Sequence, residues 1–337
     1  MNNYFQLSKI SEYRTELMGM SAMLILICHS VAYIEMPIFW GYALSFGNIG
    51  VDLFLFLSGM GMWFSLTKPL KGGVKHWYLN RYIKLLIPYL MVILPLNAIE
   101  YEMGMYKGQD IWNYLFGLTT LRFYVSHDAP WFIAALLPLY LLAPLFYRLI
   151  RKYRWKATIL IIGMLYATLL IPSSFSSDLL NSVISNIQFV TVRATCFIMG
   201  MGMGQAIKEK KTINLLWILL LAANGLLIVL LTRHLVYGYF FFTLLLLVLF
   251  CWLIEHGGDL LSKSTRFMGK ISLESYLLNG ILPKMVIFLF AVFGLSTGNN
   301  VIPYWIACIL GCALGFSFHI FSSKLIIAIT NKKNLRC

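Results

Sequence analysis

Residues 16–30 read ELMGMSAMLILICHS, and this stretch decides the fold class. Together with the residues up to 35 it forms an apolar run that is long enough for a helix to cross a bilayer. His29 lies inside this run. An ionisable side chain at membrane depth is costly to place, so it is a functional candidate, and imidazole exchanges a proton near neutral pH. The alternative is a polar residue that joins two transmembrane helices.

The rest of the chain has the same apolar character. Of its 337 residues, 60% are hydrophobic and 12% are charged, and the mean hydropathy is +0.77. Soluble domains have about half apolar and about a quarter charged residues. We therefore expect a polytopic membrane protein with a single membrane-embedded domain over residues 1–337. The polar start of the chain and the lack of a small-residue cleavage site argue against a signal peptide, so the first apolar segment is expected to stay as a helix.

The charge and cysteine content argue against nucleic-acid-binding, metal-binding and disulfide-rich proteins. The net charge of +14 is typical of nucleic-acid binding, but in a membrane protein the positive-inside rule explains it better, and we expect no nucleic-acid partner. Of the six cysteines, five lie in apolar segments and the sixth is Cys337. No pair has metal-ligand spacing, so we expect neither a metal site nor a disulfide framework. Cys308 and Cys312 share one helix face and are interpreted as packing residues.

Apolar runs of about twenty residues predict an all-α bundle of about ten transmembrane helices. Residues 111–121 are apolar but short, and we interpret them as an interfacial or re-entrant segment. The Gly200-Met201-Gly202-Met203-Gly204 stretch has the small-residue spacing typical of close helix packing. The predicted spans are residues 16–35, 43–66, 83–101, 131–150, 156–173, 186–206, 213–232, 236–254, 271–293 and 302–327.

The distribution of Lys and Arg predicts the orientation. With both termini in the cytoplasm, Lys107, Arg122 and Arg233 are the only basic residues on the outer side. Arg193 and Lys284 fall within spans, and the rest of the 27 Lys and Arg residues fall on the inner side. This asymmetry favours ten spans with cytoplasmic N and C termini. The longest outer loop, residues 102–130, is rich in aromatic residues, which suit either an interfacial belt or stacking on a sugar ring.

Five sequence segments, in order, carry a family resemblance. Residues 50–60, GVDLFLFLSGM, resemble the "GVDxFFxxSG" signature of the acyltransferase-3 family of integral-membrane acyltransferases, in the stand-alone form without a fused hydrolase-like domain. His29 matches the histidine of the family's first span. The remaining similar segments are residues 80–90 (NRYIKLLIPYL, like "RRxxRLxPxY"), 131–133 (WFI, like "WFL") and 269–278 (GKISLESYLL, like "GxxSxxxYLxH").

The sequence departs from the family pattern at two positions. The family places an arginine eleven residues before the histidine, where this chain has Met18. Arg14 lies one turn earlier on the same helix face and can reach a similar point. The family's terminal histidine is Asn279 here, and an amide does not exchange a proton.

The resemblance implies an enzyme that moves an acyl group, commonly acetyl, from cytoplasmic acyl-CoA to a hydroxyl of a surface polysaccharide or lipid-linked sugar. The implied location is the inner (plasma) membrane. Acyl-CoA is then a donor substrate, so no permanently bound cofactor is expected. Partners are this donor, the glycan acceptor and the bilayer; a homo-oligomer is possible, and the acceptor sugar is left open.

Acyl transfer to a hydroxyl needs a base for the alcohol proton and donors for the developing oxyanion. His29 is the expected base, about 20 Å along its helix at about 1.5 Å per residue, and Asp52 is a candidate to orient it. Ser58 has no adjacent base in the sequence, so we interpret it as a packing or tunnel-lining residue.

Charged residues supply the expected binding groups. Arg14, Arg81 and Lys84 lie at the inner face, where they can bind the phosphates of the donor; ordinary positive-inside anchoring is the alternative for Arg81 and Lys84. Substrate-binding candidates are Trp131 and the intramembrane charges Arg193 and Glu274, with a belt position for the tryptophan and a buried ion pair for the charges as the alternatives.

Two other functions stay open. A transporter or flippase could move a proton or a sugar past His29, Arg193 and Glu274, although no matching broken helices are seen in two halves of the chain. A catalytically idle assembly partner is the third possibility, because Met18 and Asn279 depart from the family pattern. Dependence on acyl-CoA separates the enzyme from the transporter, and loss of function on replacing His29 separates it from the idle partner.

Overall fold

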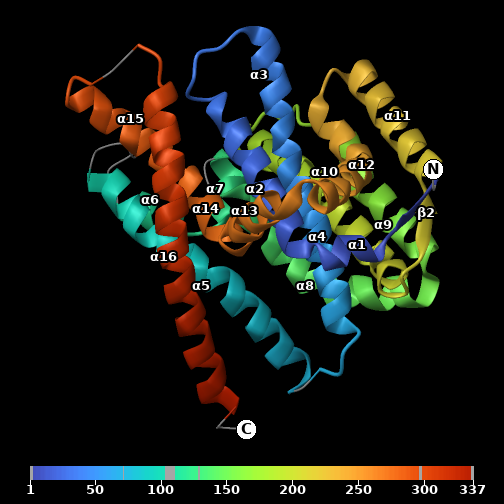
Figure 1. Cartoon of the computed structure of the whole chain (residues 1–337). Coiled ribbons are helices and arrows are strands. Elements are labelled where there is room, and N and C mark those ends of the chain that lie inside the picture. Colours follow the sequence, from blue (N-terminus) through green and yellow to red (C-terminus); the bar gives the residue numbers. More distant parts are fainter. Residues whose placement is uncertain (1–2, 71, 103–110, 128–129, 296–297, 335–337) are drawn as a thin grey trace.

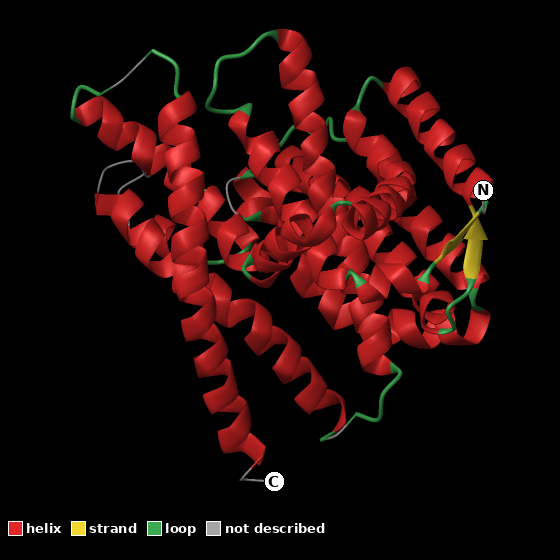
Figure 2. Cartoon of the chain, viewed as in Figure 1, coloured by secondary structure: helices red, strands yellow, loops and turns green. Residues whose placement is uncertain are grey.

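The structure, a computed structural model, describes residues 3–70, 72–102, 111–127, 130–295 and 298–334. Within these residues helices dominate, and the strands are two segments of three residues (Figure 2). The predicted all-α class is confirmed.

In chain order, the elements are β1 (Tyr4–Gln6), α1 (Ser8–Glu12), α2 (Arg14–Ser30), α3 (Ile38–Ser45), η1 (Phe46–Ile49), α4 (Gly50–Leu66), α5 (Gly73–Glu102), α6 (Ile111–Gly117), α7 (Leu121–Ser126), α8 (Trp131–Tyr153), α9 (Trp155–Ala167), η2 (Thr168–Leu170), α10 (Asp178–Lys208), β2 (Thr212–Asn214), α11 (Leu215–Thr232), α12 (Leu235–His256), α13 (Gly258–Lys270), α14 (Ser272–Asn279), α15 (Leu282–Val292) and α16 (Val301–Asn334).

Each of the ten predicted spans overlaps a helix. In the described part of the chain, seven helices are long and apolar enough to cross a membrane, and the bent pair α14–α15 would make an eighth. The first and fifth predicted spans correspond to α2, with 17 residues, and α9, with 13, which are shorter than the roughly 20 residues of a full crossing. The protein is therefore a multi-pass helical membrane protein, and its number of spans stays a prediction.

Prolines explain where two predicted spans are interrupted. The fifth span ends early because Pro172 forces Ile171 into an extended conformation, with ψ of 121°. The ninth span is two helices, α14 and α15, bent by 44°. Pro283 lies at the start of α15, and its ring would clash with the carbonyl of Asn279 in a continuous helix. The break leaves Asn279 as the last residue of α14.

Two helices differ from the predicted boundaries. The third span begins ten residues early, as α5, and stays helical through Pro88 and Pro95; neighbouring helices allow such prolines in membranes. Residues 111–121 form α6 and the start of α7, which fits the expected short segment. Residues 103–110 and 128–129 of the aromatic outer loop lie outside the described residues, as does Cys337.

Glycines set the closest helix crossings. A Cβ on Gly200 of α10 would lie 2.1 Å from the carbonyl oxygen of Phe56 in α4, and one on Gly59 would lie 2.0 Å from that of Phe197. The two helices can approach this closely only because these positions carry no side chain. The predicted packing role of the Gly200–Gly204 stretch is therefore confirmed. A second crossing of this kind joins α2 to α13, an amphipathic helix that the sequence analysis did not identify.

Contacts between distant segments are consistent with the predicted sidedness. β1 pairs antiparallel with β2, with Phe5 opposite Ile213. β1 lies in the predicted inner N-terminal segment, and β2 takes the first two residues of the predicted span 213–232, so that α11 begins at Leu215. Lys9 forms a 2.7 Å ion pair with Glu255, also between predicted inner segments. On the opposite side, the Asn300 amide donates to the carbonyl of Tyr33. Figure 1 shows the loops before α3 and α12 and the start of α16 at one end, and the end of α4, the start of α5 and the end of α16 at the other.

Candidate active site

His29 lies one residue from the end of α2 and is half-buried. Its Nδ1 atom lies 2.5 Å from Oδ1 of Asn279, which is 250 residues away in the chain and 3% exposed. The helix break at Pro283 ends α14 at this asparagine. Two helices from opposite ends of the sequence therefore bring the predicted base together with the residue that replaces the family's terminal histidine.

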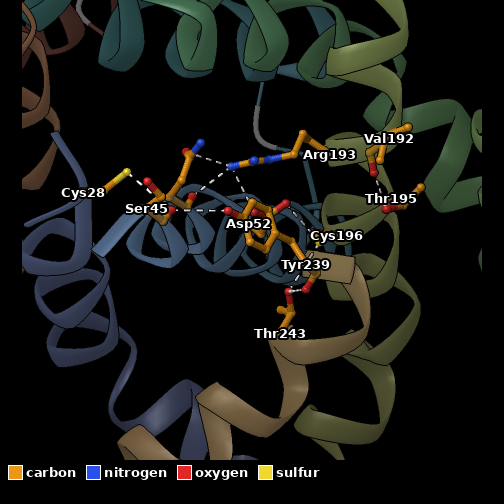
Figure 3. Close-up of polar contacts among 10 residues, drawn as sticks. Cys28, Ser45, Asp52, Val192, Arg193, Thr195, Cys196, Tyr239 and Thr243 are labelled. Atoms are coloured by element: carbon orange, nitrogen blue, oxygen red, sulfur yellow. Dashed lines mark hydrogen bonds and ion pairs between the residues drawn. The ribbon is translucent and has the colours of Figure 1, made fainter. Parts of the chain in front are cut away.

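Asp52 contacts a different partner from the one expected. It was predicted to orient His29, but its carboxylate lies 3.0 Å from the guanidinium of Arg193, and both side chains are almost completely buried. Figure 3 shows Asp52 facing Arg193 and Cys196, and the Cys196 thiol donates to the carboxylate at 3.6 Å. No contact between Asp52 and His29 is recorded among the described residues, so any part for Asp52 in the reaction stays a prediction.

Aromatic rings surround the Arg193 guanidinium. Its Cζ lies 4.9 Å from the ring centres of Trp131 and Tyr239 and 5.6 Å from that of Phe189. Arg193 also donates to the backbone carbonyl of Asn48 at 2.9 Å. This set of contacts places Trp131 beside Arg193. The geometry matches a buried structural ion pair stabilised by cation–π contacts.

Glu274 lies in a separate polar cluster. Its Oε1 atom is 3.2 Å from Nδ1 of His319 and accepts a hydrogen bond from the Ser322 hydroxyl. The side chain of Glu274 is 3% exposed, whereas that of His319 is 36% exposed. Arg193 and Glu274 therefore pair with different residues rather than with one another.

A cationic pocket gathers the three predicted donor-binding residues. It has a volume of about 140 Å³ and lies between α2, α4, α5, α8 and α14. None of its described lining residues is acidic. The residues that give it its chemistry are Arg14, Met18, Ser58, Arg81, Lys84 and Tyr140.

The charges in this pocket have few partners. Arg81 donates to the Ser65 hydroxyl and stacks on Trp77, with 5.8 Å between Cζ and the ring centre. The Nε atom of Arg14 is buried without a hydrogen-bond partner, as are Nε and Nη1 of Arg193, but the charge of Arg193 faces the Asp52 carboxylate. A buried donor without a partner is costly, so this pocket is suited to an anion that would complete its hydrogen bonds.

The pocket and His29 lie at different levels of α2. Met18, which lines the pocket, precedes His29 by eleven residues, or about 16 Å along the helix at about 1.5 Å per residue. Arg14 lies one turn further from the histidine. A ligand that uses both regions must therefore be long.

Sequence reasoning identified the basic residues and His29 but missed the contact partners. Tyr140 lines the pocket, and the sequence analysis assigned it no part. Asn279 was noted only as a departure from the family pattern, and it contacts His29. Its position at a motif end before Pro283 was the one signal that could have marked it.

The fold and these sites define a multi-pass helical membrane protein with a cationic pocket and a histidine paired with an asparagine. The acyltransferase-domain model of the acyltransferase-3 family matches residues 18–320. The chain belongs to this family of membrane acyltransferases. No significant match was found among curated proteins or among solved structures.

Proposed function

We propose that the protein transfers an acyl group, most simply acetyl, from cytoplasmic acyl-CoA to a hydroxyl of an extracytoplasmic polysaccharide or lipid-linked sugar. One observation carries this proposal: Arg14, Arg81 and Lys84 line one pocket that has no acidic residue among its described lining residues. Coenzyme A carries several phosphate charges, and guanidinium groups bind phosphate in a bidentate manner. The adjoining membrane is the plasma membrane of the cell in this proposal.

The spacing along α2 supports the same donor. The phosphates would bind near Arg14, and the flexible arm of the donor would extend along the helix toward His29, about 16 Å beyond Met18. The acceptor would approach from the outer end, where His29 lies. The polar groups of donor and acceptor would then stay on their own sides of the membrane, and only the acyl group would cross.

The reaction would begin when His29 accepts the proton of the acceptor hydroxyl. The alcohol oxygen attacks the thioester carbonyl, and a tetrahedral oxyanion forms. The carbon–sulfur bond then breaks, and the thiolate of CoA takes the proton from the imidazolium. The products are the ester and free CoA, with no net change in protonation.

The first test compares cells that lack the gene and are complemented with wild type or His29→Ala. We expect wild type to restore an ester-linked acyl group on envelope glycans, measured by mass spectrometry after mild alkaline release. Loss of a general base typically costs about 10²- to 10⁴-fold, so His29→Ala at equal expression should restore almost none. Full restoration by His29→Ala would exclude this base, and no ester with wild type would favour transport or another acyl group.

The second test addresses the donor. Binding of CoA and of acetyl-CoA to the purified protein in lipid nanodiscs is measured by calorimetry. Arg81→Ala should weaken the binding of both ligands by about tenfold or more, as expected for the loss of a charge-assisted hydrogen bond. Arg151→Ala is the matched control, because this exposed arginine lies in the last turn of α8 and does not line the pocket. Equal effects of the two variants would argue against the pocket as the donor site.

A further inference from the structure

The contact between His29 and Asn279 bears on the tautomer of the neutral imidazole ring. Oδ1 of an asparagine amide can only accept a hydrogen bond. At 2.5 Å from Nδ1 of His29, it requires a proton on that nitrogen. In the neutral ring the other nitrogen, Nε2, is then unprotonated and free to act as a base.

In this orientation the N–H group of the amide also has a partner. The Nδ2 group of Asn279 donates to the Sγ atom of Cys308 in α16 at 3.7 Å. Cys308 is 5% exposed and Asn279 is 3% exposed, so water does not compete for the amide. A flipped amide would turn its N–H groups toward Nδ1 of His29 and favour the opposite tautomer, with the proton on Nε2.

The partner of His29 is neutral, which sets it apart from a carboxylate-oriented histidine. A carboxylate would stabilise the imidazolium and raise the pKa of the ring. Here the carboxylate of the family motif, Asp52, pairs with Arg193 instead. On the packed helices α2, α14 and α16, Glu274 pairs with His319, Glu16 pairs with Arg266, and Arg14 lines the cationic pocket. The Tyr304 hydroxyl donates to the carbonyl of Leu26 and also contacts Asn279 and Cys308. The other titratable side chains described on these helices are Cys28, Tyr276, Cys308, Cys312 and Lys324.

We propose that Asn279 is a positioning residue that holds His29 in the Nδ1–H tautomer, so that Nε2 is the base that accepts the acceptor's hydroxyl proton. This inference rests on the proposed acyl transfer for its catalytic consequence. Its structural part, the tautomer, does not depend on acyl transfer. The amide replaces a titratable side chain at this point, so the base works without a second proton-exchanging group.

The tautomer is measured directly by ¹⁵N solid-state NMR of histidine-labelled protein in lipid bilayers, with His29→Gln to assign the signal. We expect the wild-type ring to be neutral with its proton on Nδ1. Asn279→Ala should lose this signal or shift it toward the Nε2–H form. An Nε2–H ring in wild type would overturn the proposal whether or not the protein transfers acyl groups.

Kinetics tests the catalytic part. Asn279→Ala should lower kcat by about tenfold or more, less than removal of the base, and leave KM for acetyl-CoA unchanged. Asn279→Asp, which keeps the shape of the side chain, should move the acid limb of the pH–rate profile up by about one pH unit or more, because a carboxylate stabilises the imidazolium. An unshifted profile, or a normal kcat in Asn279→Ala, would contradict the proposal.

The chain offers matched controls on the neighbouring helix. Cys308→Ala removes the acceptor of the Asn279 amide and should reduce kcat and weaken the Nδ1–H signal. Cys312→Ala changes the same residue type one turn away, where the thiol contacts Met268, and should leave both unchanged. If Asn279→Ala does not fold, the isosteric Asn279→Asp variant decides the test. Wild-type protein that shows the Nδ1–H ring but no acyl transfer would refute the proposed function and keep the tautomer assignment.

Discussion

The buried Arg193 and the half-buried Arg14 and Arg81 differ in how their charge is balanced. Arg193 faces the Asp52 carboxylate at 3.0 Å and three aromatic rings. Arg14 and Arg81 line a cavity that has no acidic residue among its described lining residues. Removing one partner of a buried ion pair leaves an uncompensated charge and destabilises the fold, whereas removing a charge that has no partner relieves a cost to stability. The comparison distinguishes an arginine that is paired within the fold from the two that we propose bind a ligand, without reference to sequence motifs.

The largest expected effect is on the balanced pair. Arg193→Ala or Asp52→Ala should lower the free energy of unfolding by about 3–5 kcal/mol, because each leaves a buried charge without its partner. Thermal unfolding in detergent micelles measures this loss. The double variant Asp52→Leu with Arg193→Met should cost less than either single change, since it leaves no buried charge. Single variants with wild-type stability would contradict the assignment of this pair as structural.

In the cationic pocket, we expect a substitution to change the free energy of unfolding in the opposite direction. Arg14→Met should raise the free energy of unfolding of the ligand-free protein by about 1 kcal/mol, because it removes a guanidinium with a buried, unpartnered Nε. The same change should weaken acetyl-CoA binding by about tenfold or more. Unfolding measured with and without acetyl-CoA separates the two effects. Destabilisation of the ligand-free protein would show that Arg14 is balanced within the fold, like Arg193.

The smallest effect is expected at the exposed Lys9–Glu255 pair, which joins α1 to α12 at 2.7 Å. The hydrogen bond to Glu255 raises the pKa of Lys9 above its ordinary value. The pair therefore contributes fully below the ordinary lysine pKa, and its contribution is lost as the pH rises through the raised value. Lys9→Ala should cost less than about 1 kcal/mol at pH 7, measured by the same unfolding assay. A cost as large as that of Arg193→Ala would remove the contrast between exposed and buried pairs.

Most of the fold was accessible from the sequence. Apolar runs placed a helix at every predicted span, and the small-residue spacing at Gly200 predicted a close helix crossing that the structure contains. The interruptions at Pro172 and Pro283 were missed because the apolar pattern continues through them. The amphipathic helix α13 was missed because its mixed polar and apolar residues do not form a continuous apolar run.

The candidate site was only partly accessible. The positions of Arg14, Arg81 and Lys84 on the same side of the membrane followed from charge distribution, and the structure brings them into one pocket. The contact partners of His29 and Asp52 could not be predicted from the sequence. The pattern of a base with an orienting carboxylate suggested that Asp52 contacts His29, whereas the structure pairs His29 with Asn279 and Asp52 with Arg193.

The sequence by itself determined the helical class, because a chain this apolar must satisfy its backbone hydrogen bonds within each segment in lipid. It also determined which segments carry charge at their ends. Only the tertiary structure decided which polar side chains meet inside the bundle, because that depends on the order and rotation of packed helices. His29 and Asn279 are 250 residues apart, and no local pattern specifies a contact at that separation.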